Sequence, residues 1–516
     1  MPSLPAFLPL VPAALMAAAL LFLCLPGAGR RPWRLFMPLS ALALLASLPG
    51  AWPGAQPALP ASAWLALTPL GGVLAALVQL LGTVIGAFSA RYLDGEAGQQ
   101  RYAAALAGVL AAVHALLLAD HWLVLIAAWA LVGVALQHLL CFYPERPFAR
   151  LAAHKKRLAD RLADALLLAA AGLAWYATGS GSLSDLAAHV ATQGAGAALQ
   201  ASALCLALAV VLRTALLPVH GWLIQVMEAP SPVSALLHSG VVNLGGFVLI
   251  RFATLFEHSP AARWLLVTLG LATAVLAGLI MLTRITIKVR LAWSTVAQMG
   301  FMVMECGLGL YTLAALHLLG HSLYKAHHFL SASSAVRATR LQALHRDTAV
   351  HPASLLLAPL GTAAMLALLQ AALGSAPWPW WWTALLALAW APLLWLARTD
   401  TSAARLRQAA AGLTMTAGLG AAALLAHTLP LGLRDAPASA PGLLALLGLA
   451  VLYASQAWLQ WRPHALAGWR RWSYAGFYVD EYYTRLALLL WPAHRVLTPA
   501  ATPSGPARAW AAAHPH

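Results

Sequence analysis

Charged residues are scarce in this chain of 516 residues. Only 9% are Asp, Glu, Lys or Arg, and the 15 acidic residues are outnumbered by 31 basic ones. A soluble domain carries about 25% charged residues, whereas 61% of this chain is hydrophobic. The shortage of charge therefore predicts an all-α polytopic membrane protein with little sequence left for a soluble domain.

Cysteines and ligand-binding motifs are scarce too. The four cysteines are dispersed and show no CxxC spacing, which predicts neither a disulfide framework nor a metal site. There is no glycine-rich phosphate loop and no haem attachment motif. We therefore expect no cofactor on this chain, no catalytic residues, and neither redox chemistry nor ATP hydrolysis.

Apolar stretches are abundant, and about fifteen of them are long enough, or nearly so, to span a bilayer. Their approximate cores are residues 4–25, 36–51, 61–88, 103–119, 121–142, 162–178, 198–222, 233–255, 263–283, 290–308, 309–331, 353–374, 378–397, 407–428 and 441–459. The first stretch has no basic n-region, so we expect a retained helix rather than a signal peptide.

The net charge of +16 is distributed unevenly between the predicted connections. Twenty Lys and Arg residues fall on one side of the membrane, and the other side holds only Arg251, Arg263 and Arg434. This positive-inside asymmetry predicts an external N-terminus and a cytoplasmic C-terminus in a bacterial inner membrane. It also argues against a nucleic-acid partner.

A ladder of polar residues interrupts one apolar stretch. His317, His321 and Lys325 recur every four residues, and His328 follows eleven residues after the first. On a helix these four titratable side chains share one narrow face. Ionisable groups inside a membrane usually line an ion or proton pathway. The alternative is a set of buried histidines that only fix helix packing.

A second stretch, 198–222, carries Arg213 in its interior, followed by Pro218. Proline removes a backbone hydrogen bond, and irregular backbone at membrane depth is tolerated only where it is buried in protein or lines a wet cavity. Arg213 keeps its charge and needs a counter-ion or water. The alternative is that its side chain extends to the membrane interface.

Five further residues are candidates for the pathway. Glu228 precedes a Pro-x-Pro turn and is either a boundary cap or an acidic group where ions enter, and His238 lies inside the next helix. Arg161 and Asp164 have the i, i+3 spacing of a local ion pair at a helix start. Lys288 is either a positive-inside residue or part of a central relay.

Five motifs together resemble the antiporter-like membrane subunits shared by respiratory complex I and Mrp-type antiporters, from about residue 65 to 340. They are SARYLDGEAGQQRY (89–102), LLADHWLVLIAAWALVG (117–133), LLPVHGWLIQVMEAPSPVSALLH (216–238), LAWSTVAQMGFM (291–302) and HLLGHSLYKAHHFLSAS (317–333). The resemblance implies about 13–15 transmembrane helices with two inverted five-helix repeats, at about 103–255 and 263–397. Each repeat would carry a broken helix.

The same resemblance implies roles for individual residues. Arg213 stands where the family has its pumping Lys, and His238 matches the His of the following helix. His317, His321 and Lys325 match the central polar axis. Arg161 and Asp164 match an ion pair near the channel mouth.

Two departures from the family pattern stand out. Ala130 follows Trp129 where complex I subunits have Glu, and segment 353–374 holds neither the expected Lys nor any ionised group. On this interpretation the stripe from His317 to His328 is nearly all that remains of the usual chain of charges. The chain is also short for a complex I L subunit and has no long lateral helix.

With these departures the chain resembles the membrane subunit of DAB-type inorganic-carbon-accumulating complexes. That implies an H⁺- or Na⁺-conducting subunit, coupled to a large soluble carbonic-anhydrase-like partner that carries the zinc on the cytoplasmic side. The alternatives are a proton-pumping subunit of a complex I-like oxidoreductase or hydrogenase, and a Mrp-type Na⁺/H⁺ antiporter subunit. A non-transporting scaffold is the structural fallback.

These inferences divide the chain into four parts. We expect N-terminal transmembrane helices at 1–60, an antiporter-like core at 61–400, C-terminal transmembrane helices at 401–460, and an interfacial tail at 461–516. The Trp, Tyr and Arg residues of the tail suit an interfacial or docking element.

Overall fold

The computed structural model describes residues 7–25, 31–52, 64–332, 350–372, 374, 377–398, 401–462 and 467–492. These residues form helices and short connections, with three isolated β-bridges and no longer strand among them. The all-α class is therefore confirmed for the part of the chain that the structure describes. The end of the predicted tail, residues 493–516, lies outside it.

The N-terminal half is a series of long helices that ends in several short ones. They are α1 (Val11–Cys24), α2 (Pro32–Ser47), α3 (Pro69–Tyr92), α4 (Gln99–Leu117), α5 (Trp122–Leu140), α6 (Pro147–Thr178), α7 (Leu183–Gln193), α8 (Ala197–Arg213), α9 (Gly221–Gln225), α10 (Ser231–Ser239), α11 (Leu244–Arg251) and α12 (Ala253–Glu257). Short 3-10 turns adjoin several of them: η1 (Leu8–Leu10), η3 (Leu48–Ala51), η4 (Val226–Glu228) and η5 (Val241–Asn243).

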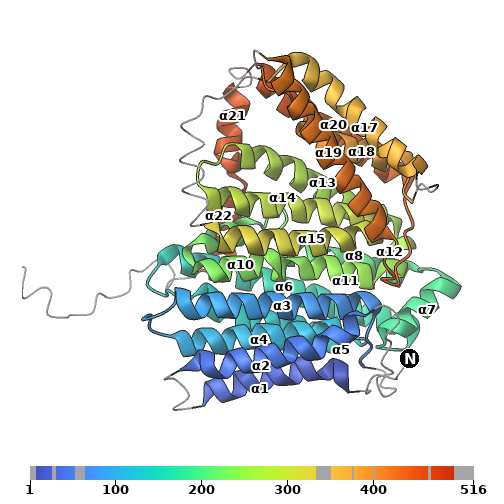
Figure 1. Ribbon diagram of the computed structural model, residues 1–516. Coiled ribbons are helices and arrows are strands. Elements are labelled where there is room, and N and C mark those ends of the chain that lie inside the picture. Colours follow the sequence, from blue (N-terminus) through green and yellow to red (C-terminus); the bar gives the residue numbers. More distant parts are fainter. Residues whose placement is uncertain are drawn as a thin grey trace, which may run out of the picture.

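The second half repeats the pattern of long helices. It contains α13 (Pro260–Leu282), α14 (Ile287–Leu308), α15 (Tyr311–Leu330), α17 (Pro352–Ala372), α18 (Trp380–Trp390), η6 (Ala391–Leu394), α19 (Ser402–His427), α20 (Ser439–Trp461), α21 (Ala467–Tyr474), η7 (Gly476–Tyr478) and α22 (Val479–Leu490). Most long helices run nearly side by side, and α17 to α20 form a group at one end of the array (Figure 1).

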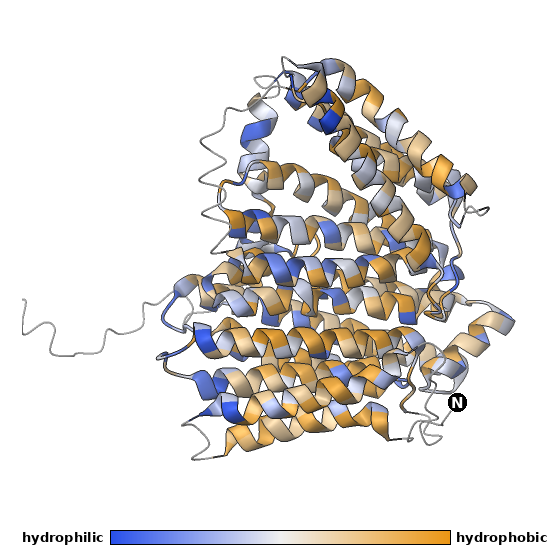
Figure 2. Ribbon diagram, in the orientation of Figure 1, coloured by the Kyte–Doolittle hydropathy of each residue, from blue (hydrophilic) through white to orange (hydrophobic). Residues whose placement is uncertain are grey.

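Each of the fifteen predicted apolar stretches contains helix in the structure. Among the described residues, nine helices are long and apolar enough to cross a membrane by length and composition. Apolar residues dominate the outer helices, whereas hydrophilic residues gather at helix ends and within the middle helices around α14 and α15 (Figure 2). The interior of the bundle therefore holds polar groups that its lipid-facing sides lack.

The first predicted break is confirmed. α8 ends at Arg213, residues 214–220 are not helical, and α9 begins at Gly221. The next stretch is also interrupted, because α10 and α11 are joined by the 3-10 turn η5. Most residues of both interruptions are buried in protein, although Pro218 is exposed. Backbone that leaves its helical bonds within a membrane must be buried in protein or line a wet cavity.

The second predicted break is wrong. α17 runs from Pro352 to Ala372 without interruption and accommodates Pro359 inside the helix. A proline can be tolerated there when local adjustment satisfies the freed carbonyl. The two repeats therefore differ in backbone as well as in charge.

Close helix packing in the second repeat depends on paired glycines. α13 and α14 pack along much of their length, and Gly270 on α13 faces Gly300 on α14. A Cβ added at Gly270 would lie 2.6 Å from the Gly300 carbonyl oxygen, and one added at Gly300 would lie 2.7 Å from the Gly270 oxygen. Small residues at such crossings let two backbones approach closely.

We predict that Gly270→Ala destabilises the protein by about 1–3 kcal/mol, because the new methyl group meets backbone atoms that cannot rotate away. The matched control is Gly278→Ala, two turns further along α13. A Cβ at Gly278 meets nothing closer than 3.8 Å. Thermal unfolding in detergent should show a lower midpoint for the first variant only. Equal midpoints would contradict the close-packing argument.

Candidate functional site

The predicted ladder on α15 is largely buried in the bundle. Lys325 is fully buried, and His321 is 6% exposed. The Lys325 ammonium donates to the Leu291 carbonyl oxygen at 3.0 Å and to the Ser294 hydroxyl on α14. Among the described residues no carboxylate forms a salt bridge with Lys325. A buried cation without a counter-ion is costly, which makes this position a candidate for a functional role.

The two histidines deepest in this region also lack partners. Neither ring nitrogen of His321 or His238 has a hydrogen bond in the described structure. His238, on α10, is fully buried and stacks on Phe329 of α15, with 4.5 Å between ring centroids. Buried polar atoms are normally satisfied by protein or ordered water. These orphaned nitrogens are what a water- or proton-carrying site would leave unpaired.

Lys325, His321 and His238 form a line of buried basic side chains. His317 and Glu305 lie at the other end of this line. His317 Nδ1 lies 2.8 Å from a Glu305 carboxylate oxygen on α14, and the His317 and His321 ring centroids are 6.0 Å apart. Glu305 is 4% exposed, and local spacing in the sequence does not indicate His317 as its partner. In the loop beyond α19, Asp435 accepts a hydrogen bond from the Thr312 N–H and caps α15. Burial raises the pKa of this loop carboxyl above its usual value.

His328 does not join the buried line. It is only half-buried, its Nδ1 bonds to the Tyr324 carbonyl one turn back, and its ring lies against that of Tyr324 at 4.0 Å. The spacing predicted the correct helix for His328, but the prediction that it lies on the buried face is wrong. The predicted stripe therefore ends at Lys325.

Arg213 occupies the break predicted for it and is paired. Its guanidinium forms an ion pair with Asp164 on α6 and donates to the Trp129 carbonyl oxygen at 2.7 Å. The group also lies over the Trp129 ring, 4.8 Å from its centroid. Because Arg213 is only 5% exposed, it is a buried and paired cation rather than one that extends to the interface.

The predicted Arg161–Asp164 pair is wrong. Both residues lie in the middle of α6 rather than at a helix start, and Asp164 pairs with Arg213 instead. Arg161 is exposed, and its guanidinium lies over the Trp491 ring at 5.6 Å. Residues three apart on a helix are neighbours, but Asp164 pairs with Arg213 from another helix rather than with its neighbour Arg161.

α6 carries a second polar ladder that sequence reasoning missed. Lys156, Asp160 and Asp164 recur every four residues, the spacing that identified the ladder on α15. The Lys156 ammonium contacts the Asp160 carboxylate at 2.5 Å and lies 5.0 Å from the Trp222 ring centroid. Lys156 is 3% exposed and Asp160 is 8% exposed. The stripe on α15 is therefore not nearly all that remains of the chain of charges.

A glycine on α5 makes room for this ladder. A Cβ at Gly133 would lie 2.8 Å from an Asp160 carboxylate oxygen. Gly133 is three residues beyond Ala130, where the family resemblance leads one to expect a Glu. The Asp160 carboxylate of α6 thus lies beside α5, the helix that lacks the expected Glu.

Two remaining candidates lie near the face of the molecule that carries the basic loops. Glu228 is paired with Arg146, which donates to the Glu228 carbonyl oxygen at 2.8 Å, and both side chains are exposed. Of the two interpretations of Glu228, the boundary pair is the one that the structure favours. Lys288 lies in the first turn of α14 and donates to the Ser231 hydroxyl at 2.7 Å. Its place in a relay stays a prediction.

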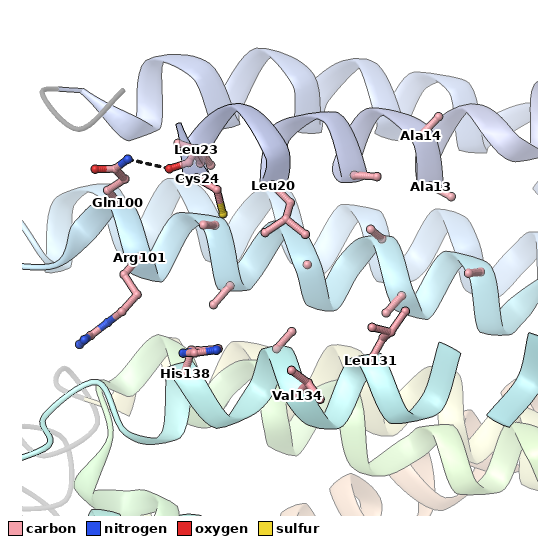
Figure 3. Close-up of a pocket in the computed structure, with 18 of the residues that line it drawn as sticks. Ala13, Ala14, Leu20, Leu23, Cys24, Gln100, Arg101, Leu131, Val134 and His138 are labelled. Carbon is pink, nitrogen blue, oxygen red and sulfur yellow. Dashed lines mark hydrogen bonds between the residues drawn. The ribbon is translucent and has the colours of Figure 1, made fainter. Parts of the chain in front are cut away.

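An apolar cavity of about 920 Å³ lies apart from both ladders, among α1, α4 and α5. Figure 3 shows small residues along its length and the polar side chains of Gln100, Arg101 and His138 at one end. None of the residues of the two ladders lines it. The candidate site is therefore the set of buried charges, not this cavity.

We predict that Asp164→Ala destabilises the protein by about 3–5 kcal/mol, because it leaves the buried Arg213 cation without its carboxylate. The double variant Asp164→Ala, Arg213→Met should recover part of that loss. The control is Arg161→Ala, one turn away on α6, which should change stability by less than about 0.5 kcal/mol. Thermal unfolding in detergent measures all three. Equal losses for Asp164→Ala and Arg161→Ala would contradict the pairing.

Comparison with known families agrees with this arrangement. The transmembrane family described as NADH:quinone oxidoreductase/Mrp antiporter matches residues 119–391. By structure, the chain is similar to a subunit of the Mrp complex from Dietzia, with a TM-score of 0.57 and 23% identity. That match covers 98% of this chain and 59% of the Dietzia chain. It supports the antiporter-like fold.

Three relatives by sequence are two inorganic carbon transporter subunits and one oxidoreductase subunit. The probable inorganic carbon transporter subunit DabB of Hydrogenovibrio crunogenus is 39% identical over 83% of this chain and 84% of its own length. DabB2 of Halothiobacillus neapolitanus is 46% identical over 51% of this chain and 48% of its own length. NADH-quinone oxidoreductase subunit L of Mycobacterium tuberculosis is 32% identical over 51% of this chain and 42% of its own length.

The extent of these matches and the helical bundle lead to one conclusion. The chain is a multi-pass membrane protein of the antiporter-like family that NADH:quinone oxidoreductases and Mrp antiporters share, and within that family it belongs with the DabB-type inorganic carbon transporter subunits.

Proposed function

We propose that this chain is the H⁺- or Na⁺-conducting subunit of a two-component inorganic carbon uptake complex in a bacterial inner membrane. A large soluble carbonic-anhydrase-like partner on the cytoplasmic side would carry the zinc and hydrate CO₂ to bicarbonate. The names of the DabB relatives support inorganic carbon as the transported substrate. The ion gradient would supply the energy that makes hydration run in one direction.

The observation that carries this proposal is the buried line of basic groups on α10 and α15. His238 and His321 have free ring nitrogens, and Lys325 binds only neutral acceptors. Histidine exchanges protons near neutral pH, and a Lys without a carboxylate partner can give up its proton without breaking an ion pair. Such groups suit transfer of a proton along a short interior route.

Arg213 has a different proposed role. Its guanidinium stays protonated at any working pH, so it serves as a fixed charge that gates the route rather than as a carrier. Asp164, its carboxylate partner, can accept a proton and thereby loosen the pair. Protons would then pass between the α6 ladder and the α15 line when the pair opens.

We predict that Lys325→Ala and His321→Ala each abolish most bicarbonate accumulation, because each removes a carrier from the middle of the route. The assay is uptake of labelled inorganic carbon by cells that lack other uptake systems, with membrane expression verified. The matched control is His327→Ala on the same helix, an exposed neighbour that we expect to leave uptake unchanged. Normal uptake in both interior variants would overturn the pathway.

The alternatives make different predictions in the same cells. Collapse of the proton gradient should stop uptake if H⁺ is the driving ion, and removal of Na⁺ should stop it if Na⁺ is. Purification should also recover a soluble zinc protein. Co-purification with quinone-oxidoreductase subunits instead would favour a redox-driven proton pump, and with other Mrp-type subunits an antiporter.

A further inference from the structure

The C-terminal helices α21 and α22 fold back onto the core. α22 packs against α6 and α9. α21 packs against α13 and lies beside one end of that helix in Figure 1. Arg284, between α13 and α14, lies over the rings of both Trp293 and Tyr474. The part of the tail that the structure describes, residues 467–492, therefore contacts its own chain at the broken helix.

Asp480 makes the central contact of this tail. One carboxylate oxygen accepts a hydrogen bond from the Lys155 ammonium at 2.7 Å, and the other accepts one from the Gln225 amide at 3.3 Å. The Thr484 hydroxyl, one turn along α22, accepts a second hydrogen bond from Lys155 at 3.0 Å. The side chain of Lys155 is fully buried, so the tail brings a carboxylate to a cation inside the protein.

A glycine at the broken helix makes room for this carboxylate. A Cβ at Gly221, the first residue of α9, would lie 1.4 Å from a carboxylate oxygen of Asp480 and 2.6 Å from the Lys155 nitrogen. No side chain other than hydrogen fits there while Asp480 stays in place. Glycine is the residue that allows such close approach to backbone.

The contact continues the ladder on α6. Lys155 pairs with Asp480, Lys156 with Asp160, and Asp164 with Arg213. The α6 members of these three ion pairs span ten residues, from Lys155 to Asp164, a rise of about 14 Å. The pair at the Lys155 end is the only one of the three completed by the tail. Its Asp480 side chain is 27% exposed, and the Asp164 side chain at the other end is 29% exposed.

We propose that Asp480 is the outer carboxylate of the ion route through the first repeat, so that the tail is a working part of the route. Ions would meet Asp480 first and reach the Asp164–Arg213 pair by way of Lys155, Lys156 and Asp160. The proposal rests on the ion-conducting function proposed above. It adds a residue from the chain's end to a site otherwise built from the first repeat.

The test compares four variants of the full chain in its complex. Asp480→Asn keeps the shape and an oxygen that can accept the hydrogen bond from Lys155 but removes the carboxylate charge, and we expect at least a tenfold loss in the rate of bicarbonate uptake. Asp480→Glu restores a carboxylate and should recover a substantial part of the rate. Glu481→Gln removes the neighbouring, exposed carboxylate and should leave the rate unchanged. Gly221→Ala, which displaces Asp480, should match Asp480→Asn.

Limited proteolysis of the purified complex shows whether the tail stays docked in each variant. Loss of uptake with a docked tail supports the proposal. Normal uptake in Asp480→Asn would overturn it, faster uptake would show that the tail is a plug, and release of the tail would show that Asp480 is an anchor. Normal uptake in Lys325→Ala instead counts against ion conduction itself, which separates failure of the proposed function from failure of this inference.

Discussion

The structure depends on how charged side chains are held inside an apolar bundle. Along α6 these charges are paired. Lys155 and Lys156 of α6 and Arg213 of α8 each contact a carboxylate at close range. Buried ion pairs often add little stability, because desolvation offsets the attraction, whereas removal of one partner is costly. A bundle selected for stability alone could use apolar residues at these positions. The retention of three pairs within ten residues of α6 therefore argues for a role in moving charge.

The two ladders handle charge in opposite ways. Each buried lysine of α6 has an acid, and Asp164 of α6 pairs with Arg213, so these charges are held in place by partners. On α15 and α10, Lys325, His321 and His238 have no acid, and only His317 does, at the far end. Under the proposed function, a charge that enters among the ion pairs of α6 would pass on to the unpaired basic groups of α10 and α15. Within the interrupted stretch between α8 and α11, α9 packs against α6 and α10 packs against α15, so this stretch joins the two regions.

The sequence predicted those features that depend on local spacing. The interior face of α15 follows from residues four apart, and the break after Arg213 follows from the proline beyond it. Pairing partners could not be predicted in this way, because Asp164 and Arg213 are 49 residues apart and Lys155 and Asp480 are 325 apart. The α6 ladder did have a local signal in its spacing. That signal is ambiguous, because lysines near the start of α6 also fit the positive-inside pattern.

The second repeat constrains where a route can leave the bundle. α17 is continuous and carries no ionised side chain, so it provides neither a break nor a charge at mid-depth. Beyond Lys325 and His321, the pair that continues along α14 and α15 in the described interior is His317 and Glu305. Asp435 adds a second carboxylate at the start of α15. Under the proposed function, a route through the bundle would therefore follow α14 and α15 and would not cross into α17. The two repeats would then differ, with three ion pairs along α6 in the first repeat and carboxylates only at the far end of α15 in the second.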